Sequence, residues 1–168
     1  LSRLTISACG TAYFAGLIAK YWFEKYARLP VDVDVASEFR YREPPVEQGG
    51  LSLFISQSGE TADTLAALRY WAREGQHISS LVNVPESTIA RESHVVFPTH
   101  AGPEIGVAST KALTALLTAL ASLVIAAGVA RGVLDAGREQ ELVGALTSLP
   151  AAVSAPLDGL SIANAQNS

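Results

Sequence analysis

The chain has 168 residues, of which 49% are hydrophobic and 17% charged, so it suits one well-packed domain of about 150 residues and is not intrinsically disordered. Its formal net charge is −4 and it has no run of Lys or Arg, which argues against bulk nucleic-acid binding. Cys9 is the single cysteine and no secretory signal pattern opens the chain, so the composition excludes a disulfide framework and predicts a reducing, cytoplasmic compartment.

Strand-like and helix-like segments alternate in the first half of the chain. Residues 4–9 are mainly apolar and predict a buried strand, and residues 11–27 place apolar side chains at helical spacing. In 31–35, Val alternates with Asp, which predicts a half-exposed strand. Residues 51–56 predict a second buried strand, which is followed by a helix over 65–75.

The alternation continues, which predicts the fold class. Residues 77–84 and 94–98 predict strands, with a short helix over 87–92 between them. Strands that alternate with helices indicate a parallel sheet covered on both faces, an α/β fold of three layers. Five strands allow the doubly wound, flavodoxin-like order 2-1-3-4-5. The Asp/Val strand suits an edge and the two apolar runs suit the centre, as this order requires.

A long uncharged segment, residues 112–130, is long enough to cross a bilayer. It is rich in Ala, which inserts weakly, and Thr114, Thr118 and Ser122 form a polar stripe at i, i+4 spacing. We therefore predict a buried helix of an α/β domain. Such a helix needs more cover than one small domain provides, which favours self-association.

The last residues of the chain are expected to lie outside the domain. A last helix is predicted over 135–149 and ends at Pro150, so the domain is expected to cover residues 1–149. Residues 150–168 are small, polar and marked by Pro and Gly, which is typical of a linker. Because the sequence has no Met, we expect the chain to be a piece of a longer protein.

Two turns are expected to meet at the sheet's carboxyl edge. In the order 2-1-3-4-5, ligands bind in the crevice between the first and third strands. The turns there are residues 9–12 and 56–61, and both combine Gly with hydroxyl side chains ahead of a helix. Free N–H groups and the positive end of the helix dipole make such positions anion sites.

The second turn predicts a neutral phosphate cradle. The hydroxyls of Ser56, Ser58 and Thr61 and the Gln57 amide are expected to donate hydrogen bonds to phosphate oxygens. Without a clamping Lys, this arrangement suits a phosphate that serves as a binding handle. The patterns GxxxxGK[ST] and GxGxxG are absent, so neither nucleotide hydrolysis nor a dinucleotide site is indicated, and no cofactor is expected. The alternative is that Ser58 merely caps the following helix.

The remaining candidate groups are weaker. Cys9 is a possible nucleophile, although a lone Cys is more often inert. Asp32 and Asp34 could bind a cation, but a role as the solvated side of an edge strand is favoured. The three His residues lack the spacing of metal ligands, so no metal site is expected. The Gly-rich loop 102–110 borders the crevice and suits a role in covering a ligand, with helix capping as the alternative.

Five segments, in order, give the chain a family resemblance over residues 4–130. The chain resembles the first sugar isomerase (SIS) half-domain of the glucosamine-6-phosphate synthase family. The segments are ACGTAYFAG, ASEFRYR, SQSGETADTLAALR, VNVPESTIARES and GPEIGVASTKA. The resemblance implies an enzyme that converts fructose-6-phosphate and glutamine to glucosamine-6-phosphate.

The resemblance also implies which residues bind substrate. The sugar phosphate is held by the serine-rich loop, by the first turn and by a segment that lines the sugar pocket. These residues are, in order, Ser56, Gln57, Ser58 and Thr61; Cys9, Gly10, Thr11 and Ala12; and Val107, Ala108 and Ser109. The chain departs from the family at Ala12, where Ser is usual, and at Phe14, where His is usual. We expect weaker phosphate binding at Ala12.

The family resemblance places catalysis elsewhere. It implies an N-terminal glutaminase and two SIS half-domains, with the isomerase base, the ring-opening His and the Schiff-base Lys in the second half-domain and its tail. Residues 150–168 are then a linker or the start of that half-domain. The chain is expected to bind fructose-6-phosphate or glucosamine-6-phosphate weakly, to turn nothing over, and to form a homodimer.

Two other functions share some of these features. One is the sugar-phosphate-sensing SIS module of a transcription factor, although no helix-turn-helix pattern or basic patch is present in the sequence. The other is a flavodoxin-like electron carrier. Its hydroxyl-rich loop normally follows the first strand, whereas the loop here follows the third.

Overall fold

A five-stranded parallel sheet forms the centre of the computed structural model, which describes residues 1–42, 44–46, 49–105 and 109–165, without the side chains of Arg40 and of 156–165. The sheet has the order β2-β1-β3-β4-β5, and every neighbouring pair is parallel. This order and the edge position of the Asp/Val strand are confirmed. The strands are β1 (Leu4–Ala8), β2 (Val31–Val35), β3 (Leu51–Ser56), β4 (His77–Val82) and β5 (Val95–Pro98).

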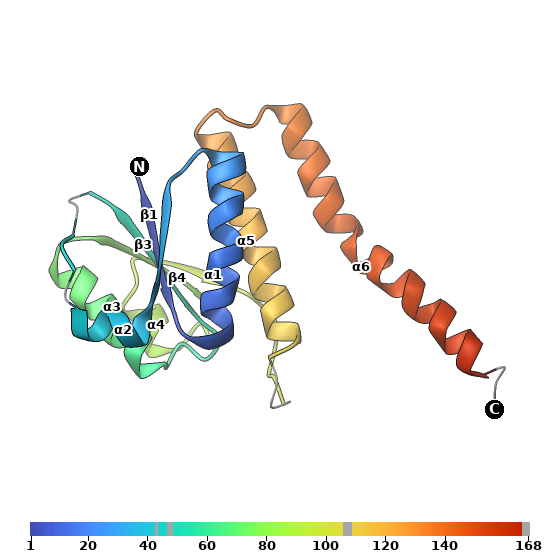
Figure 1. Ribbon diagram of the computed structural model, residues 1–168, viewed down its shortest axis with the longest axis horizontal. Helices are drawn as coiled ribbons and strands as arrows, with labels where there is room; N and C mark the ends of the chain where they lie inside the picture. The colour runs from blue at the N-terminus through green and yellow to red at the C-terminus, as the bar shows by residue number, and fades with distance from the viewer. Residues whose placement is uncertain (43, 47–48, 106–108, 166–168) are drawn as a thin grey trace.

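Helices cover both faces of the sheet, which confirms the three layers (Figure 1). One face carries α1 (Gly10–Trp22), which continues into a π-helical turn, η1 (Phe23–Ala27), and α5 (Lys111–Ala130). The other face carries α2 (Ala36–Arg42), α3 (Ala62–Arg73) and α4 (Thr88–Arg91). The two turns after β1 and β3 therefore lead to helices on opposite faces and share the sheet's carboxyl edge.

Each face of the sheet has its own core. On the α1/α5 face, Ile6 and Ile55 pack with Ala15, Ala19 and Leu120, all fully buried. The small Ala side chains let α1 lie close to the strands, and burial of large aliphatic groups beside them contributes about 1.5–3 kcal/mol per side chain. These contacts hold α1 against β1 and β3.

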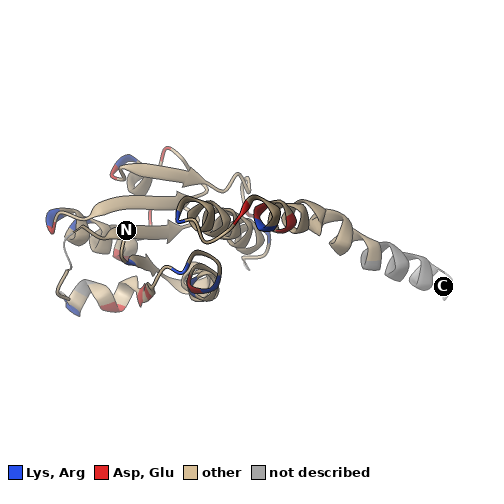
Figure 2. Cartoon of the chain, turned by 90° about the horizontal axis from the view of Figure 1, so that it is seen from above, with Lys and Arg blue, Asp and Glu red and all other residues tan. Residues whose placement is uncertain are grey.

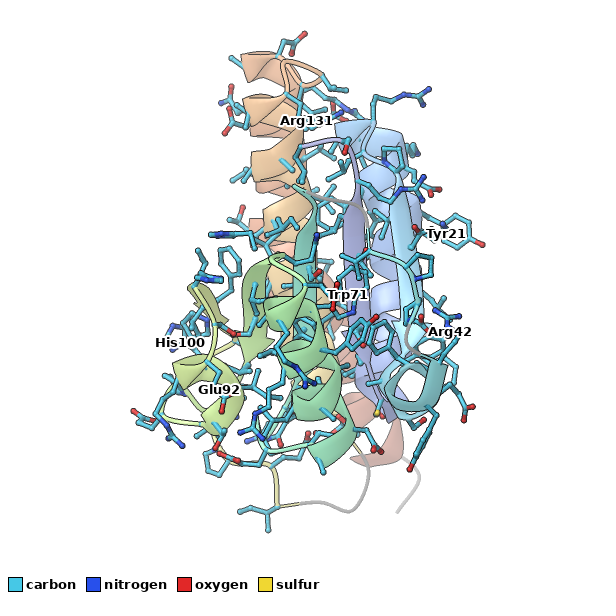
Figure 3. The ribbon with its side chains drawn as sticks, turned by 90° about the vertical axis from the view of Figure 1, so that its left-hand side faces the viewer. Tyr21, Arg42, Trp71, Glu92, His100 and Arg131 are labelled. Atoms are coloured by element: carbon cyan, nitrogen blue, oxygen red, sulfur yellow. The ribbon has the colours of Figure 1, made fainter. Side chains whose placement is uncertain are left out.

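The second core explains a helix that the sequence did not predict. Residues 36–42 form α2, a helix of 7 residues, which is too short to have a clear apolar period. Its Phe39 is buried and stacks on Trp71 with the ring centroids 5.4 Å apart. Trp71 lies inside the body, whereas the ring of Tyr21 points away from it (Figure 3). Tertiary packing, rather than local propensity, holds α2 in place.

The expected end of the last helix at Pro150 is wrong, because α6 runs from Ala136 to Ala165 (Figure 1). A Pro inside a helix removes one hydrogen bond and normally kinks or ends it. Here residues 147–155 are exposed, and Leu146, whose carbonyl Pro150 leaves without an intrahelical donor, is half-buried. The Thr147 and Ser148 hydroxyls also donate to carbonyls of the preceding turn. The division of the chain at residue 150 stays a prediction.

Helix α5, which is uncharged after Lys111, lies beside α1, as predicted for a core helix, and Leu116, Leu120 and Val124 are buried. The Thr114, Thr118 and Ser122 hydroxyls face outward and donate to carbonyls one turn earlier. Among the described residues, α5 is the one helix long and apolar enough to cross a membrane, which by itself is weak support for a span. After Lys111, α5 carries no charge, and within residues 136–155 the charges of α6 lie near its start, at Arg138, Glu139 and Glu141 (Figure 2).

Candidate functional site

A pocket of about 350 Å³ opens at the carboxyl edge of the sheet, where the turns after β1 and β3 meet. This volume lies within the range of small-molecule sites. The residues that line it come from three segments of the chain. They are Cys9, Thr11 and Ala12; Ile55, Ser56, Gln57, Ser58 and Thr61; and Glu104, Ser109 and Leu116.

Most of the residues predicted from the sequence lie together in this pocket. Gly10 lies between two residues that line it. Val107 and Ala108 fall outside the described residues. Sequence reasoning missed Ile55, Glu104 and Leu116. The sequence did contain a hint of Glu104: it is the one acidic residue in the Gly-rich loop 102–110, which was noted as bordering the crevice.

The first turn presents the start of α1 to the pocket. Cys9 is extended, with φ −123° and ψ 156°, and Gly10 turns the chain with a φ of +55°, a left-handed conformation that favours Gly. No side chain caps α1, and its first turn holds no acidic residue. The first N–H groups of a helix have no intrahelical acceptor, so those of α1 remain available to a ligand at this edge of the sheet.

The second turn is organised by its own hydroxyls. The Gly59 amide donates to the Ser56 oxygen at 3.0 Å, and the Ser56 and Thr61 hydroxyl oxygens lie 2.9 Å apart. The Glu60 amide donates to the Ser58 oxygen at 3.2 Å. The alternative that Ser58 caps the helix is wrong, because the N-cap of α3 is Thr61, which makes no side-chain cap bond.

These bonds limit what the turn can donate to a ligand. The Ser56–Thr61 pair shares one of its two hydroxyl protons internally, so the pair has one left to donate. The Ser58 oxygen only accepts within the turn, so its proton is free for a ligand. Two of the amides, those of Gly59 and Glu60, are already occupied. The turn can therefore donate fewer hydrogen bonds to a ligand than three independent hydroxyls and a full set of amides could.

Gly59 is required by the close approach of α4. Its φ is +67°, and a Cβ there would lie 1.9 Å from the Ser87 hydroxyl oxygen. The Gly59 carbonyl accepts from the Ile89 amide at 3.0 Å. The Glu60 carboxylate accepts from the Thr88 amide at 2.7 Å, and this bond lowers the pKa of Glu60. The start of α4 therefore braces the turn from outside the pocket.

Glu104 forms the third wall of the pocket and binds the start of α5. One carboxylate oxygen accepts from the Thr110 amide and hydroxyl, each at 3.2 Å, and the other accepts from the Ala112 amide at 3.3 Å. Desolvation raises the pKa of Glu104, but the hydrogen bonds from Thr110, Ala112 and Lys111 together outweigh it, so the pKa is lowered. The carboxylate is therefore charged and fixed in the pocket.

The weaker candidate groups have structural partners. Cys9 is a free thiol that lines the pocket, and the Thr64 hydroxyl donates to its sulfur at 3.9 Å. Asp32 and Asp34 form exposed ion pairs with Arg3 and Arg42, as befits a solvated edge. Within the described part of the chain, His, Cys, Asp and Glu form no group of three that could hold a metal ion.

Comparison with known proteins agrees with this geometry. The family model described as SIS domain matches residues 2–126. The chain is 67% identical over 150 residues to the glutamine–fructose-6-phosphate aminotransferase (isomerizing) of Mesorhizobium japonicum, and 64% identical over 158 residues to that of Agrobacterium fabrum. These matches cover 89% and 94% of this chain.

A solved structure gives the same result. The C-terminal domain of glucosamine-fructose-6-phosphate aminotransferase from Francisella tularensis superimposes with a TM-score of 0.89 at 44% identity, over 94% of this chain and 45% of that one. The chain spans about a quarter of the length of the curated relatives it matches. The SIS domain match covers well over half of the 168 residues. The chain belongs to the SIS domain family.

Proposed function

We propose that the pocket binds the phosphate of a sugar phosphate and that the chain is the first SIS half-domain of an enzyme that converts fructose-6-phosphate and glutamine to glucosamine-6-phosphate. The observation that carries this proposal is the meeting of two uncapped helix starts, α1 and α3, with the Ser56–Thr61 hydroxyl pair in one pocket. Relatives named for this aminotransferase reaction, at 64–67% identity, support the choice of enzyme.

The charges of the pocket orient the ligand. A phosphate is repelled by the fixed carboxylate of Glu104 and attracted by the helix starts, so it lies against residues 9–12 and 56–61. The sugar then extends toward Glu104 and Ser109. The lone pairs of Glu104 Oε1 are taken by the Thr110 amide and hydroxyl, so a sugar hydroxyl would donate to Oε2, which accepts from the Ala112 amide.

Catalysis needs more than these residues. Ring opening and amination use acid–base groups poised near neutral pH. The described pocket residues include no His and no Lys. We therefore assign substrate binding to this chain and propose that a second SIS half-domain supplies the catalytic groups and a glutaminase domain the ammonia. The relatives, about four times as long as the matched region, leave room for both.

The assembly and compartment follow as parts of the same proposal. A homodimer is favoured by an apolar stripe on α1, where Phe14, Ile18 and Tyr21 are 61%, 40% and 70% exposed at helical spacing. A single free Cys suits a cytoplasmic enzyme. The relatives named for the aminotransferase do not favour a transcription-factor sensor.

The test is binding by the 168-residue chain of fructose-6-phosphate, glucose-6-phosphate and inorganic phosphate, followed by amide chemical shifts in NMR. We expect both sugar phosphates to perturb residues 9–12 and 56–61. We also expect no glucosamine-6-phosphate from this chain with fructose-6-phosphate and ammonia. Absence of binding by all three ligands would overturn the proposed site, and product formation would overturn the assignment of catalysis to other domains.

A further inference from the structure

Asn83 joins two loops of the site without lining the pocket. It directly follows β4, and its backbone amide donates to the Gln57 carbonyl at 3.2 Å. This bond ties the residue to the turn 56–61. Because the bond is made by the backbone, it is independent of the side chain at position 83.

The side chain of Asn83 holds the loop that follows β5. Its oxygen accepts from the Thr99 hydroxyl at 3.0 Å and from the Ala101 amide at 2.8 Å, and its nitrogen donates to the Gly102 carbonyl at 2.8 Å. These partners fix the orientation of the side-chain amide, since two donors face the oxygen and one acceptor faces the nitrogen.

The loop needs such a brace. His100 has a φ of +53° and Gly102 a φ of +69°, so two of its residues adopt the left-handed conformation. For His100, this conformation is unfavourable unless surrounding bonds hold it. The loop leads, two residues after Gly102, to Glu104, which forms the third wall of the pocket.

We propose that Asn83 is a positioning residue, which sets the distance between the turn 56–61 and Glu104 and thereby the affinity for the sugar part of the ligand. This inference rests on the proposed function. The phosphate contacts only the turns, whose link to Asn83 is through its backbone. Loss of the side chain therefore weakens sugar-phosphate binding and spares binding of inorganic phosphate.

The test compares Asn83→Ala with the wild-type chain by NMR titration. For Asn83→Ala we expect about a tenfold weaker Kd for fructose-6-phosphate, the effect of about one lost hydrogen bond. We expect the Kd for inorganic phosphate to stay within about twofold. The Thr110 and Ala112 amide signals should also move, because both amides bind Glu104.

A matched control separates positioning from stability. The His94 ring nitrogen accepts from the Ile78 amide at 2.9 Å and so braces β4 and β5 at their opposite ends, away from the pocket. His94→Ala should lower the melting temperature and leave the ratio of the two Kd values unchanged. If Asn83→Ala does not fold, Thr99→Val tests the proposal instead, because it removes a single hydrogen bond to Asn83. We expect it to shift the ratio of the Kd for fructose-6-phosphate to the Kd for inorganic phosphate in the same direction.

Each outcome has one meaning. If the wild-type chain binds neither ligand, the proposed function fails. If it binds both, and Asn83→Ala or Thr99→Val leaves the ratio of Kd values at the wild-type level, the inference about Asn83 is wrong while the proposed function stands. A ratio that shifts equally in His94→Ala also contradicts the inference, since a general loss of stability would then explain it.

Discussion

The hydroxyl oxygens of Ser56 and Thr61 lie 2.9 Å apart, five residues along the chain, and Ser56 also accepts from the Gly59 amide. The two side chains therefore act as one unit with a single proton to donate. Ser56 is 2% exposed, so its main effect is to hold the turn closed.

This pairing predicts different effects for the two hydroxyls. Ser56→Ala leaves the buried Gly59 amide without an acceptor, which should lower the free energy of unfolding by about 1–3 kcal/mol. Thr61→Val should mainly weaken sugar-phosphate binding. In the double variant, the loss of binding energy should be smaller than the sum of the single losses, by about 0.5 kcal/mol or more. Denaturant unfolding and ligand titration measure both, and additive losses would contradict the pairing.

Gly59→Ala should open the turn. A Cβ at position 59 would lie 1.9 Å from the Ser87 oxygen, and the φ of +67° costs a non-Gly residue about 1–2 kcal/mol. We expect stability to fall by at least about 2 kcal/mol and phosphate binding to be lost.

Gly144→Ala is the matched control for this change. A Cβ there meets nothing within 4 Å in helix α6, so we expect a stabilisation of about 0.5–1 kcal/mol and unchanged binding. Equal stability of Gly59→Ala and wild type in urea unfolding would show that the turn tolerates a side chain.

Ala12→Ser should strengthen phosphate binding. Ala12 lines the pocket at the start of α1, and the SIS half-domain that the chain resembles usually has Ser there. A hydroxyl at this position would donate a charge-assisted hydrogen bond, so we expect the Kd for inorganic phosphate to improve about tenfold.

Ala15→Ser serves as its control, one turn further along α1. Ala15 is fully buried in the core and does not line the pocket, so its Ser variant should be less stable and bind phosphate no better. Isothermal titration of both variants makes the comparison, and an unchanged Kd in Ala12→Ser would indicate that the phosphate lies elsewhere.

Glu104 should make the stability of the fold depend on pH, in a direction that its pKa shift determines. Its folded-state pKa is lowered, because its hydrogen bonds outweigh desolvation, so its contribution to stability is present above the pKa of the unfolded chain and is lost as the pH falls through the folded pKa. Glu104→Gln should therefore be less stable than wild type at pH 7, and the difference should shrink below about pH 4. Thermal unfolding between about pH 3 and pH 8 measures it, because this range extends well above the titration of a carboxylate near pH 4. A difference that grows on acidification would contradict the assignment.

Patterns local to the sequence predicted the architecture well. Alternating Val and Asp identified the edge strand β2, and the apolar runs identified β1 and β3 as central. By contrast, α2 depends on the stacking of Phe39 on Trp71, two residues far apart in the chain. The continuation of α6 past Pro150 was missed because a Pro inside a helical pattern normally ends or kinks the helix.

For the site too, features that follow from local patterns were predicted, whereas features that depend on tertiary contacts were missed. The two turns were predicted to meet because the strand order brings their strands together, and they line one pocket. Glu104 was missed as a wall because its role comes from bonds to Thr110 and Ala112, and these exist only once the loop has folded back on α5. Hydroxyl pairing in the turn 56–61 likewise depends on its folded geometry.

The most direct test of the central claim is the set of amide shifts caused by inorganic phosphate in the 168-residue chain. If both turns close over one phosphate, residues 9–12 and 56–61 should shift together with a single Kd, and the Glu104-bound amides of Thr110 and Ala112 should move less. Shifts in one turn without the other, or two different Kd values, would contradict a shared phosphate site.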